Sequence, residues 1–166
     1  HGTTPYSTRA FNEADSLDDV AQAISTQAQR EVFPVVGDLT DDATVQRLAS
    51  QICQHFGQID ILVNCGGGDI GAQGTLGENG GKPLANDAIF IDLADIKSVL
   101  DRNLMTCLLC CRAVAPAMMA RKAGWIVNIG SVGGTGGRDH GVIYGTAKAA
   151  VHHYSRCLAA QLRPYN

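Results

Sequence analysis

Three side chains that can perform proton chemistry lie close together in the sequence. Ser131 follows the apolar run WIVNIG, and Tyr144 and Lys148 are four positions apart in YGTAK. On a helix this spacing puts a phenol and an ammonium on one face. A tyrosine ordinarily ionises near pH 10, so acid–base work near neutrality needs a fall of about 3 pKa units, or roughly 4 kcal/mol. An ammonium about 4 Å away, at an effective dielectric near 20, supplies about that much.

These residues therefore predict a tyrosine that exchanges protons with a substrate, with Ser131 hydrogen-bonded to the substrate oxygen. Each residue also has an ordinary structural interpretation. Ser131 can end a strand in a turn, Tyr144 can be a half-buried aromatic, and Lys148 can be a solvated helix residue. The combination at this spacing favours catalysis over the separate structural roles.

The elements that must position these residues follow from hydrophobic patterning. Short β-branched runs predict buried parallel strands at 31–39, 59–64 and 125–131. Apolar residues at helical spacing predict helices at 16–29, 40–57, 93–122 and 142–162, with Ser16 as an N-cap and Gly57 as a stop. Pro116 should kink or interrupt the third helix. This order predicts an α/β fold with an open, doubly wound parallel sheet, Rossmann-like, with right-handed crossovers.

A glycine pattern after the second predicted strand needs a separate interpretation. Gly66, Gly68 and Gly71 fit G-x-G-x-x-G, the pattern of a dinucleotide-binding loop. A true pyrophosphate loop needs a helix that starts within the pattern, and AQGTLGENGGKPLAND is too rich in Gly, Asn and Pro for one. We therefore expect a strand end where glycines let a flat group approach the backbone.

Composition restricts the class of protein. The 166 residues suit one domain, and a net charge of -3 without a basic stripe argues against nucleic acid as a partner. No apolar run approaches the roughly 20 residues of a membrane span, so we expect a cytoplasmic protein without membrane contact. The six cysteines are expected to be reduced thiols.

Three of these cysteines, Cys107, Cys110 and Cys111, have helical spacing that admits two interpretations. A zinc site would need a further pair of Cys or His ligands at suitable spacing, which the sequence lacks. Buried free cysteines in a helix are the favoured alternative, and no metal is expected.

Together these motifs resemble the short-chain dehydrogenase/reductase family, classical type, over nearly the whole chain. Ser131, Tyr144 and Lys148 are similar to its catalytic serine and Y-x-x-x-K motif, and Asn103 falls where the family carries an asparagine in its long central helix. ILVNCGG (61–67) is similar to the family's N-N-A-G segment, with Cys65 and Gly66 replacing the second Asn and the Ala. GDLTD (37–41) is similar to the segment whose aspartate meets adenine.

The resemblance implies hydride transfer between NAD(P) and the carbon of a small alcohol or carbonyl substrate. Tyr144 would be the general acid/base, Lys148 would assist it and hold the nicotinamide ribose, and Ser131 would stabilise the substrate oxygen. Asn103 would help hold a proton-relay water. The implied cofactor-binding residues are Asp38, Leu39, Asn64, Cys65, Gly66, Tyr144 and Lys148.

The sequence also departs from the family. The family's first strand with its Gly-rich loop and its last strands are missing, so residues 1–166 resemble the central part of a longer, single NAD(P)-binding domain. We expect these residues alone to be unstable or inactive. The region that selects the cofactor falls near HGTTPYSTR, where Thr3, Thr4, Ser7 and Arg9 precede the first acid, Glu13, which favours NADP over NAD.

Several alternatives remain open at this stage. The chain could be a catalytically silent nucleotide-binding or oligomerising fragment of such an enzyme. The family resemblance implies a homodimer or homotetramer through the Asn103 and Tyr144 helices. The polar, Gly-rich segment 69–92 could be a lid, a subunit contact or a tolerated surface loop. His152 and His153 are expected at solvated or interface positions.

Overall fold

The computed structural model describes residues 16–165 and contains two compact units, one up to Val36 and one from Gly37 onwards. In the first unit, helix α1 (Leu17–Ala28) begins at Ser16, whose hydroxyl accepts a hydrogen bond from the Asp19 N–H at 3.1 Å. Asp18 and Asp19 in the first turn complement the helix dipole. The predicted helix and its cap are therefore confirmed.

The predicted strand at 31–39 is absent from the structure, which gives this segment no regular secondary structure. A strand exists through hydrogen bonds to a neighbouring strand, and the structure pairs β1 and β2 with each other and neither with this segment. Val36, within the segment, is 75% exposed. The β-branched composition thus predicted a strand whose pairing partner does not occur among the described residues.

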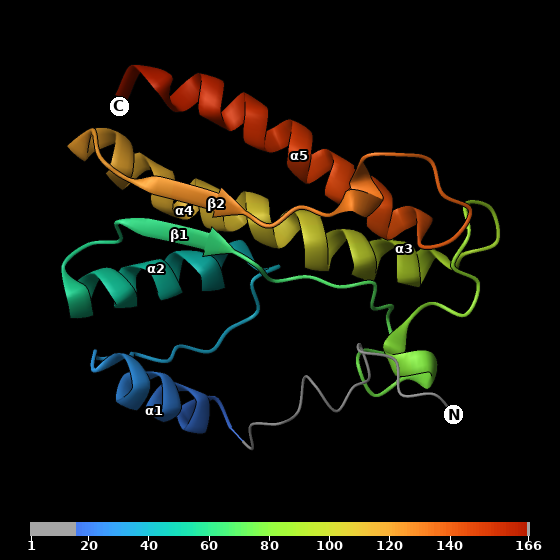
Figure 1. Ribbon diagram of the computed structural model, residues 1–166, viewed down its shortest axis with the longest axis horizontal. Helices are drawn as coiled ribbons and strands as arrows, with labels where there is room; N and C mark the ends of the chain where they lie inside the picture. The colour runs from blue at the N-terminus through green and yellow to red at the C-terminus, as the bar shows by residue number, and fades with distance from the viewer. Residues whose placement is uncertain (1–15, 166) are drawn as a thin grey trace. The chain divides into compact units, whose positions relative to one another are not determined.

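The second unit contains a two-stranded parallel sheet covered on one face by helices (Figure 1). Strand β1 (Ile61–Asn64) pairs with β2 (Trp125–Asn128), so that Asn64 lies opposite Asn128. Cys107 and Cys111 from α4 (Thr106–Arg121) and Val151 from α5 (Val142–Leu162) pack on Leu62 and Ile126 of the sheet. The second and third predicted strands and the last predicted helix are confirmed, and the unit is part of a Rossmann-like α/β fold.

Helix α2 (Asp42–Phe56) precedes the sheet, is capped by Asp41 and ends at the predicted Gly57. The Asp41 carboxylate accepts from the Thr44 N–H at 2.8 Å, and Gly57 ends the helix with a φ of 88°, which favours glycine. The buried side chains of α2 are Val45 and Leu48, and α2 packs on α4. Helix α2 therefore extends the helical layer beside the sheet.

The long central helix is irregular at a different place from the one predicted. It consists of α3 (Leu93–Leu100), a π-helical segment η3 (Asp101–Met105) and α4, which continues through Pro116 to Arg121. The prediction of an interruption at Pro116 is therefore wrong. The π-helical segment contains Asn103 instead, and such single π turns often occur at functional sites.

This long helix also corrects the expectation that no segment approaches the length of a membrane span. Within residues 16–165, Leu93–Arg121 is long and apolar enough to cross a bilayer by length and composition alone. The core helix of a soluble protein meets the same criterion, so the finding is weak evidence for a span. In the structure its Cys107 and Cys111 pack against the sheet and α5.

Candidate functional site

Ser131 lies just beyond β2, where it begins the short 3-10 helix η4 (Val132–Gly134). Its hydroxyl oxygen accepts a hydrogen bond from the Gly133 N–H at 3.1 Å, which leaves the hydroxyl hydrogen and a second lone pair. Its own N–H donates to Nε2 of His152 on α5 at 3.2 Å. The serine is thus fixed through both its side chain and its backbone at the carboxyl end of the sheet.

Tyr144 and Lys148 project from consecutive turns of α5 towards the same region. The Lys148 ammonium lies 5.9 Å from the centroid of the Tyr144 ring, within cation–π range, and donates to the Ile129 carbonyl at 2.9 Å. Lys148 is 5% exposed, and burial lowers its pKa below the ordinary lysine value, against an opposing effect of the Cys107 and Cys65 thiols. The predicted phenol–ammonium pair on one helix face is present.

Asn103 is buried in the π-helical segment and binds the loop that follows β1. Its Oδ1 accepts from the Gly68 N–H at 3.0 Å, while its Nδ2 donates to the carbonyls of Gly68 and Val99, each at 2.8 Å. A Cβ on Gly67 would lie 2.5 Å from Asn103 Oδ1, which is too close, and 3.4 Å from Lys148 Nζ. The absence of a side chain at Gly67 therefore lets the Asn103 amide pack directly against the backbone of this loop.

The predicted cofactor segment at the end of β1 is partly bonded within the sheet and partly exposed. The Asn64 side chain donates to Asn128 Oδ1 at 2.8 Å and to Cys111 Sγ at 3.3 Å, so it links the two strands to α4. A hydrogen bond from Cys107 lowers the pKa of the Cys111 thiol to about 7. Cys65 and Gly66 follow as an exposed stretch at the carboxyl end of β1, where parallel sheets place ligands.

Asp38 and Leu39 lie near the surface ahead of α2. The Asp38 carboxylate accepts from the Thr40 hydroxyl at 2.7 Å and from the Thr40 N–H at 2.9 Å, and these bonds lower the pKa of Asp38. The nearby Arg102 guanidinium acts in the same direction. Asp38 is thus held as a carboxylate near Arg102, which directly precedes Asn103 in the sequence. The residues predicted to select NAD or NADP, Thr3, Thr4, Ser7 and Arg9, lie outside the described part of the chain.

A pocket of about 230 Å³ lies between the loop 133–141 and the first turns of α5, and neither Ser131 nor Tyr144 is among its lining residues. Its lining includes Gly133, Arg138, Val142 and Thr146. A Cβ on Gly133 would lie 2.8 Å from Arg138 Nη1, 3.4 Å from Ser131 Oγ and 3.7 Å from Tyr144 Cε1. The loop 133–141 therefore brings Gly133 next to Ser131 and Tyr144, while the pocket lies on the α5 face that carries Val142 and Thr146.

The segment 69–92 is attached to the start of the Tyr144 helix. Asn86, 2% exposed, donates to Asp69 Oδ2 at 2.7 Å, and its carbonyl accepts from the Gly141 N–H at 2.9 Å. The segment also carries highly exposed apolar side chains, Leu76, Leu84, Ile89 and Phe90. This attachment is compatible with each of the predicted roles, a lid, a subunit contact or a surface loop.

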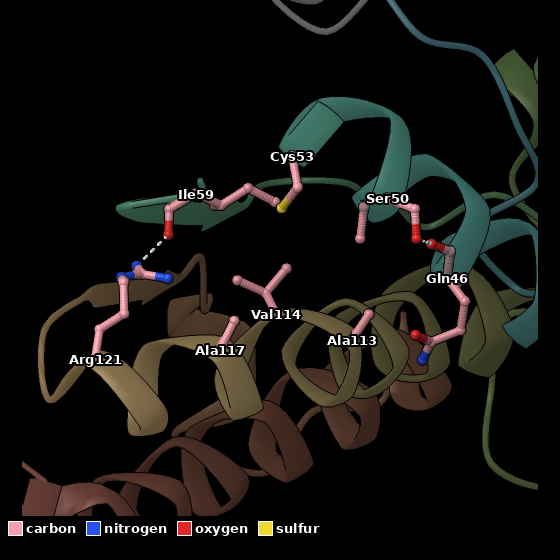
Figure 2. Close-up of a pocket in the computed structure, with 9 residues that line it drawn as sticks. Gln46, Ser50, Cys53, Ile59, Ala113, Val114, Ala117 and Arg121 are labelled. Atoms are coloured by element: carbon pink, nitrogen blue, oxygen red, sulfur yellow. Dashed lines mark hydrogen bonds between the residues drawn. The ribbon is translucent and has the colours of Figure 1, made fainter. Parts of the chain in front are cut away.

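A second pocket, of about 150 Å³, lies between α2 and α4 (Figure 2). Arg121 borders it and donates to the Ile59 carbonyl at 2.8 Å, just before β1 begins, while Cys53, Val114 and Ala117 also line it. The pocket therefore lies at the amino end of β1. Ligands of parallel α/β sheets bind at the carboxyl ends, so this pocket is not the candidate active site.

Comparison with known proteins identifies the family to which this fold and these residues belong. The family model described as short chain dehydrogenase matches residues 8–166. This chain belongs to the short-chain dehydrogenase/reductase family.

Its relatives include dehydrogenases of cyclic alcohols. The chain is 33% identical over 130 residues to cyclohexanol dehydrogenase from Rhodococcus sp. (strain TK6), covering 77% of this chain and 44% of the relative. It is 34% identical over 129 residues to 1,6-dihydroxycyclohexa-2,4-diene-1-carboxylate dehydrogenase from Pseudomonas putida, covering 78% of this chain and 42% of the relative. The chain thus spans less than half the length of these relatives.

Solved structures show the same relationship. The crystal structure of NAD+-bound xylitol dehydrogenase matches with a TM-score of 0.78 at 26% identity, over 92% of this chain and 53% of that chain. Levodione reductase matches with a TM-score of 0.73 at 26% identity, over 89% of this chain and 52% of that chain. The described fold is therefore part of the Rossmann-like fold of this family.

Sequence reasoning missed the role of His152. It was expected at a solvated or interface position, but its side chain is half-buried and accepts the Ser131 N–H. The available signal was spacing, because Tyr144, Lys148 and His152 follow one another at intervals of four and so share one face of α5.

Proposed function

We propose that this chain provides the catalytic centre of an NAD(P)-dependent oxidoreductase that acts on a small alcohol or carbonyl compound. The observation that carries the proposal is the convergence of Ser131, Tyr144 and Lys148 at the carboxyl end of the sheet. The names of the relatives, which include cyclohexanol and xylitol dehydrogenases, support an alcohol as the substrate.

The proposed roles follow from the contacts. The Ser131 hydroxyl hydrogen donates to the substrate oxygen, and the Tyr144 hydroxyl exchanges a proton with that oxygen. The Lys148 ammonium, 5.9 Å from the Tyr144 ring centroid, stabilises negative charge on the tyrosine by about 3 kcal/mol at an effective dielectric near 20. Burial of Lys148 on α5 keeps the ammonium in this place.

The exposed backbone at Cys65 and Gly66, at the carboxyl end of β1, fits the approach of a nicotinamide cofactor, because parallel α/β sheets bind their ligands at these strand ends. When bound, NAD(P) supplies the site that accepts or gives the hydride. Lys148 would hold the nicotinamide ribose, with one ammonium hydrogen already donated to the Ile129 carbonyl. Asp38, Leu39, Cys65 and Gly66 would line the adenosine side. The Asn64 side chain supports this segment from the sheet, because its amide is already bonded to Asn128 and Cys111.

Asn103 would fix the position of the loop 66–68 relative to Lys148. It would also help to order a proton-relay water. Its bonds to Gly68 and Val99 support the first of these roles directly. We propose in addition that the protein acts as a homodimer or homotetramer through the helices that carry Asn103 and Tyr144. A cytoplasmic location remains the prediction from sequence.

The test is turnover by the whole protein with a cyclic alcohol or a polyol and either NAD⁺ or NADP⁺, followed by the absorbance of the reduced cofactor. Tyr144→Phe should lower kcat by about 10³-fold, because a positioned acid–base group contributes about 10²- to 10⁴-fold. Tyr165→Phe, at an exposed tyrosine, is the matched control and should be unchanged. Cofactor binding without turnover in the unmodified protein would instead favour the catalytically silent alternative.

A further inference from the structure

The imidazole of His152 lies against the backbone that leads from β2 into Ser131. Its Nε2 accepts the Ser131 N–H at 3.2 Å. A Cβ on Gly130 would overlap the same ring, so the absence of a side chain at Gly130 lets the imidazole approach the strand end. Two neighbouring backbone positions are therefore adapted to one side chain.

These contacts bear directly on where the Ser131 hydroxyl points. Ser131 has an extended backbone, with φ of -159° and ψ of 145°, and lies between the end of β2 and the turn of η4. Its N–H is held by His152, and its hydroxyl oxygen is held by the Gly133 N–H. With both bonds present, the backbone and the side chain of Ser131 are fixed from two sides.

The hydrogen bond also determines the state of the imidazole. A ring nitrogen accepts only when it carries no proton, so His152 must be neutral with its hydrogen on Nδ1. Its neighbour His153 offers a contrast on the same helix. His153 is exposed, and its ring lies 3.5 Å from Cys157, away from Ser131.

We propose that His152 is a positioning residue that fixes Ser131 for the reaction, through acceptance of the Ser131 N–H by a neutral imidazole. This inference rests on the proposed dehydrogenase function for its catalytic consequence. The hydrogen bond itself, and the placement of Ser131 that it produces, do not depend on turnover.

Two substitutions separate the acceptor from the volume of the ring. His152→Gln keeps an acceptor at about the distance of Nε2 from the backbone, whereas His152→Leu keeps much of the volume and removes the acceptor. His153→Leu on the adjacent, exposed position is the matched control. All are made in the whole protein, which is assayed with its cofactor and a cyclic alcohol.

The expected kinetic result is a loss in kcat that the acceptor restores. His152→Leu should lower kcat by about 10- to 100-fold, because small misplacements of a catalytic group have effects of that size, with the KM for the cofactor nearly unchanged. His152→Gln should remain within about threefold of the unmodified protein, as should His153→Leu.

A spectroscopic measurement tests the hydrogen bond between Ser131 and His152 independently of enzyme activity. Long-range ¹⁵N–¹H correlation spectra of the unmodified protein should show the His152 hydrogen on Nδ1. Exchange of the Ser131 amide hydrogen should be slow in the unmodified protein and in His152→Gln, and about tenfold or more faster in His152→Leu.

Three results would overturn the proposal: a hydrogen on Nε2 of His152 in the unmodified protein, equal losses of kcat in His152→Leu and His153→Leu, or unchanged kcat in His152→Leu despite faster Ser131 exchange. If the unmodified protein turns over no substrate, the proposed function fails and the catalytic role of His152 fails with it. The tautomer and the amide exchange still decide whether His152 holds Ser131.

Discussion

Lys148 combines a cost in stability with the chemical role proposed for it. Its ammonium is buried on α5, where desolvation disfavours the charged form and lowers the pKa of the lysine. The hydrogen bond to the Ile129 carbonyl satisfies one of the three N–H donors of the ammonium. It therefore offsets part of the cost of burying the charge. A buried lysine of this kind is expected where a positive charge is needed next to a reacting group.

The pH dependence of stability should reveal this burial. Because the folded pKa lies below the unfolded value of about 10.4, the unfolded chain binds more protons between these two values, so the free energy of unfolding should rise with pH across that window. Lys148→Met should lack this rise, whereas Lys97→Met, at an exposed lysine of α3, should keep it. Urea unfolding at several pH values measures the difference, and parallel curves for the unmodified protein and Lys148→Met would contradict the argument.

Lys148→Met should also affect catalysis. Loss of about 3 kcal/mol of charge stabilisation on the tyrosine corresponds to roughly a 100-fold fall in kcat. At the residue scale, the sequence could predict where Tyr144, Lys148 and Ser131 lie, because the first two share a helix face and Ser131 follows the strand that ends beside them. It could not predict that Asn64 bonds Asn128 or that Asn103 bonds Gly68, because these contacts join segments distant in sequence.

At the scale of the elements, helix ends were predictable and strands were only partly so. Ser16 and Gly57 mark helix ends through local hydrogen bonds and backbone conformation, which the sequence alone specifies. A strand needs a partner, and 31–39 finds none among the described residues although its composition resembles that of β1. The π-helical segment was not predicted either, and its Asn103 bonds Gly68, a residue distant in sequence.

The packing of η4 on α5 gives a testable requirement at this scale. A Cβ on Gly134 would lie 2.6 Å from the Ala149 nitrogen and 2.7 Å from the Lys148 carbonyl carbon, so the two elements would have to separate. Gly134→Ala should therefore lower the free energy of unfolding by about 1–3 kcal/mol and reduce kcat by displacing Ser131 from Lys148.

Gly136→Ala is the matched control in the same loop. A Cβ there meets no atom within 4 Å, so the change in stability should stay within about 0.5 kcal/mol. Urea unfolding and turnover of both variants make the comparison. Equal effects of the two substitutions would show that the loop tolerates separation from α5 and would contradict the close packing.

At the scale of the whole molecule, the sheet of the second unit is apolar on both faces but covered by helices on one. Leu62 and Ile126 face α4 and α5, whereas Ile61, Val63, Trp125 and Val127 are between 45% and 61% exposed. Because the strand sequences do not alternate apolar and polar residues, they predicted a sheet that is covered on both faces. The sequence prediction that these residues alone are unstable or inactive rests on unpaired strand edges. The exposed apolar face acts in the same direction, because it favours association or unfolding.

Trp125 is the single tryptophan of the chain and reports on this face directly. At 61% exposed, in a polypeptide of these 166 residues it should emit at wavelengths close to those of tryptophan in water and be readily quenched by iodide. A second copy that covered the face would shield it, and dilution would then restore quenching. Shielding that persists on dilution would contradict the exposed face and show that the same chain covers its own sheet. In a longer protein whose additional residues pack on this face, Trp125 should be shielded at every concentration, because intramolecular cover does not depend on dilution.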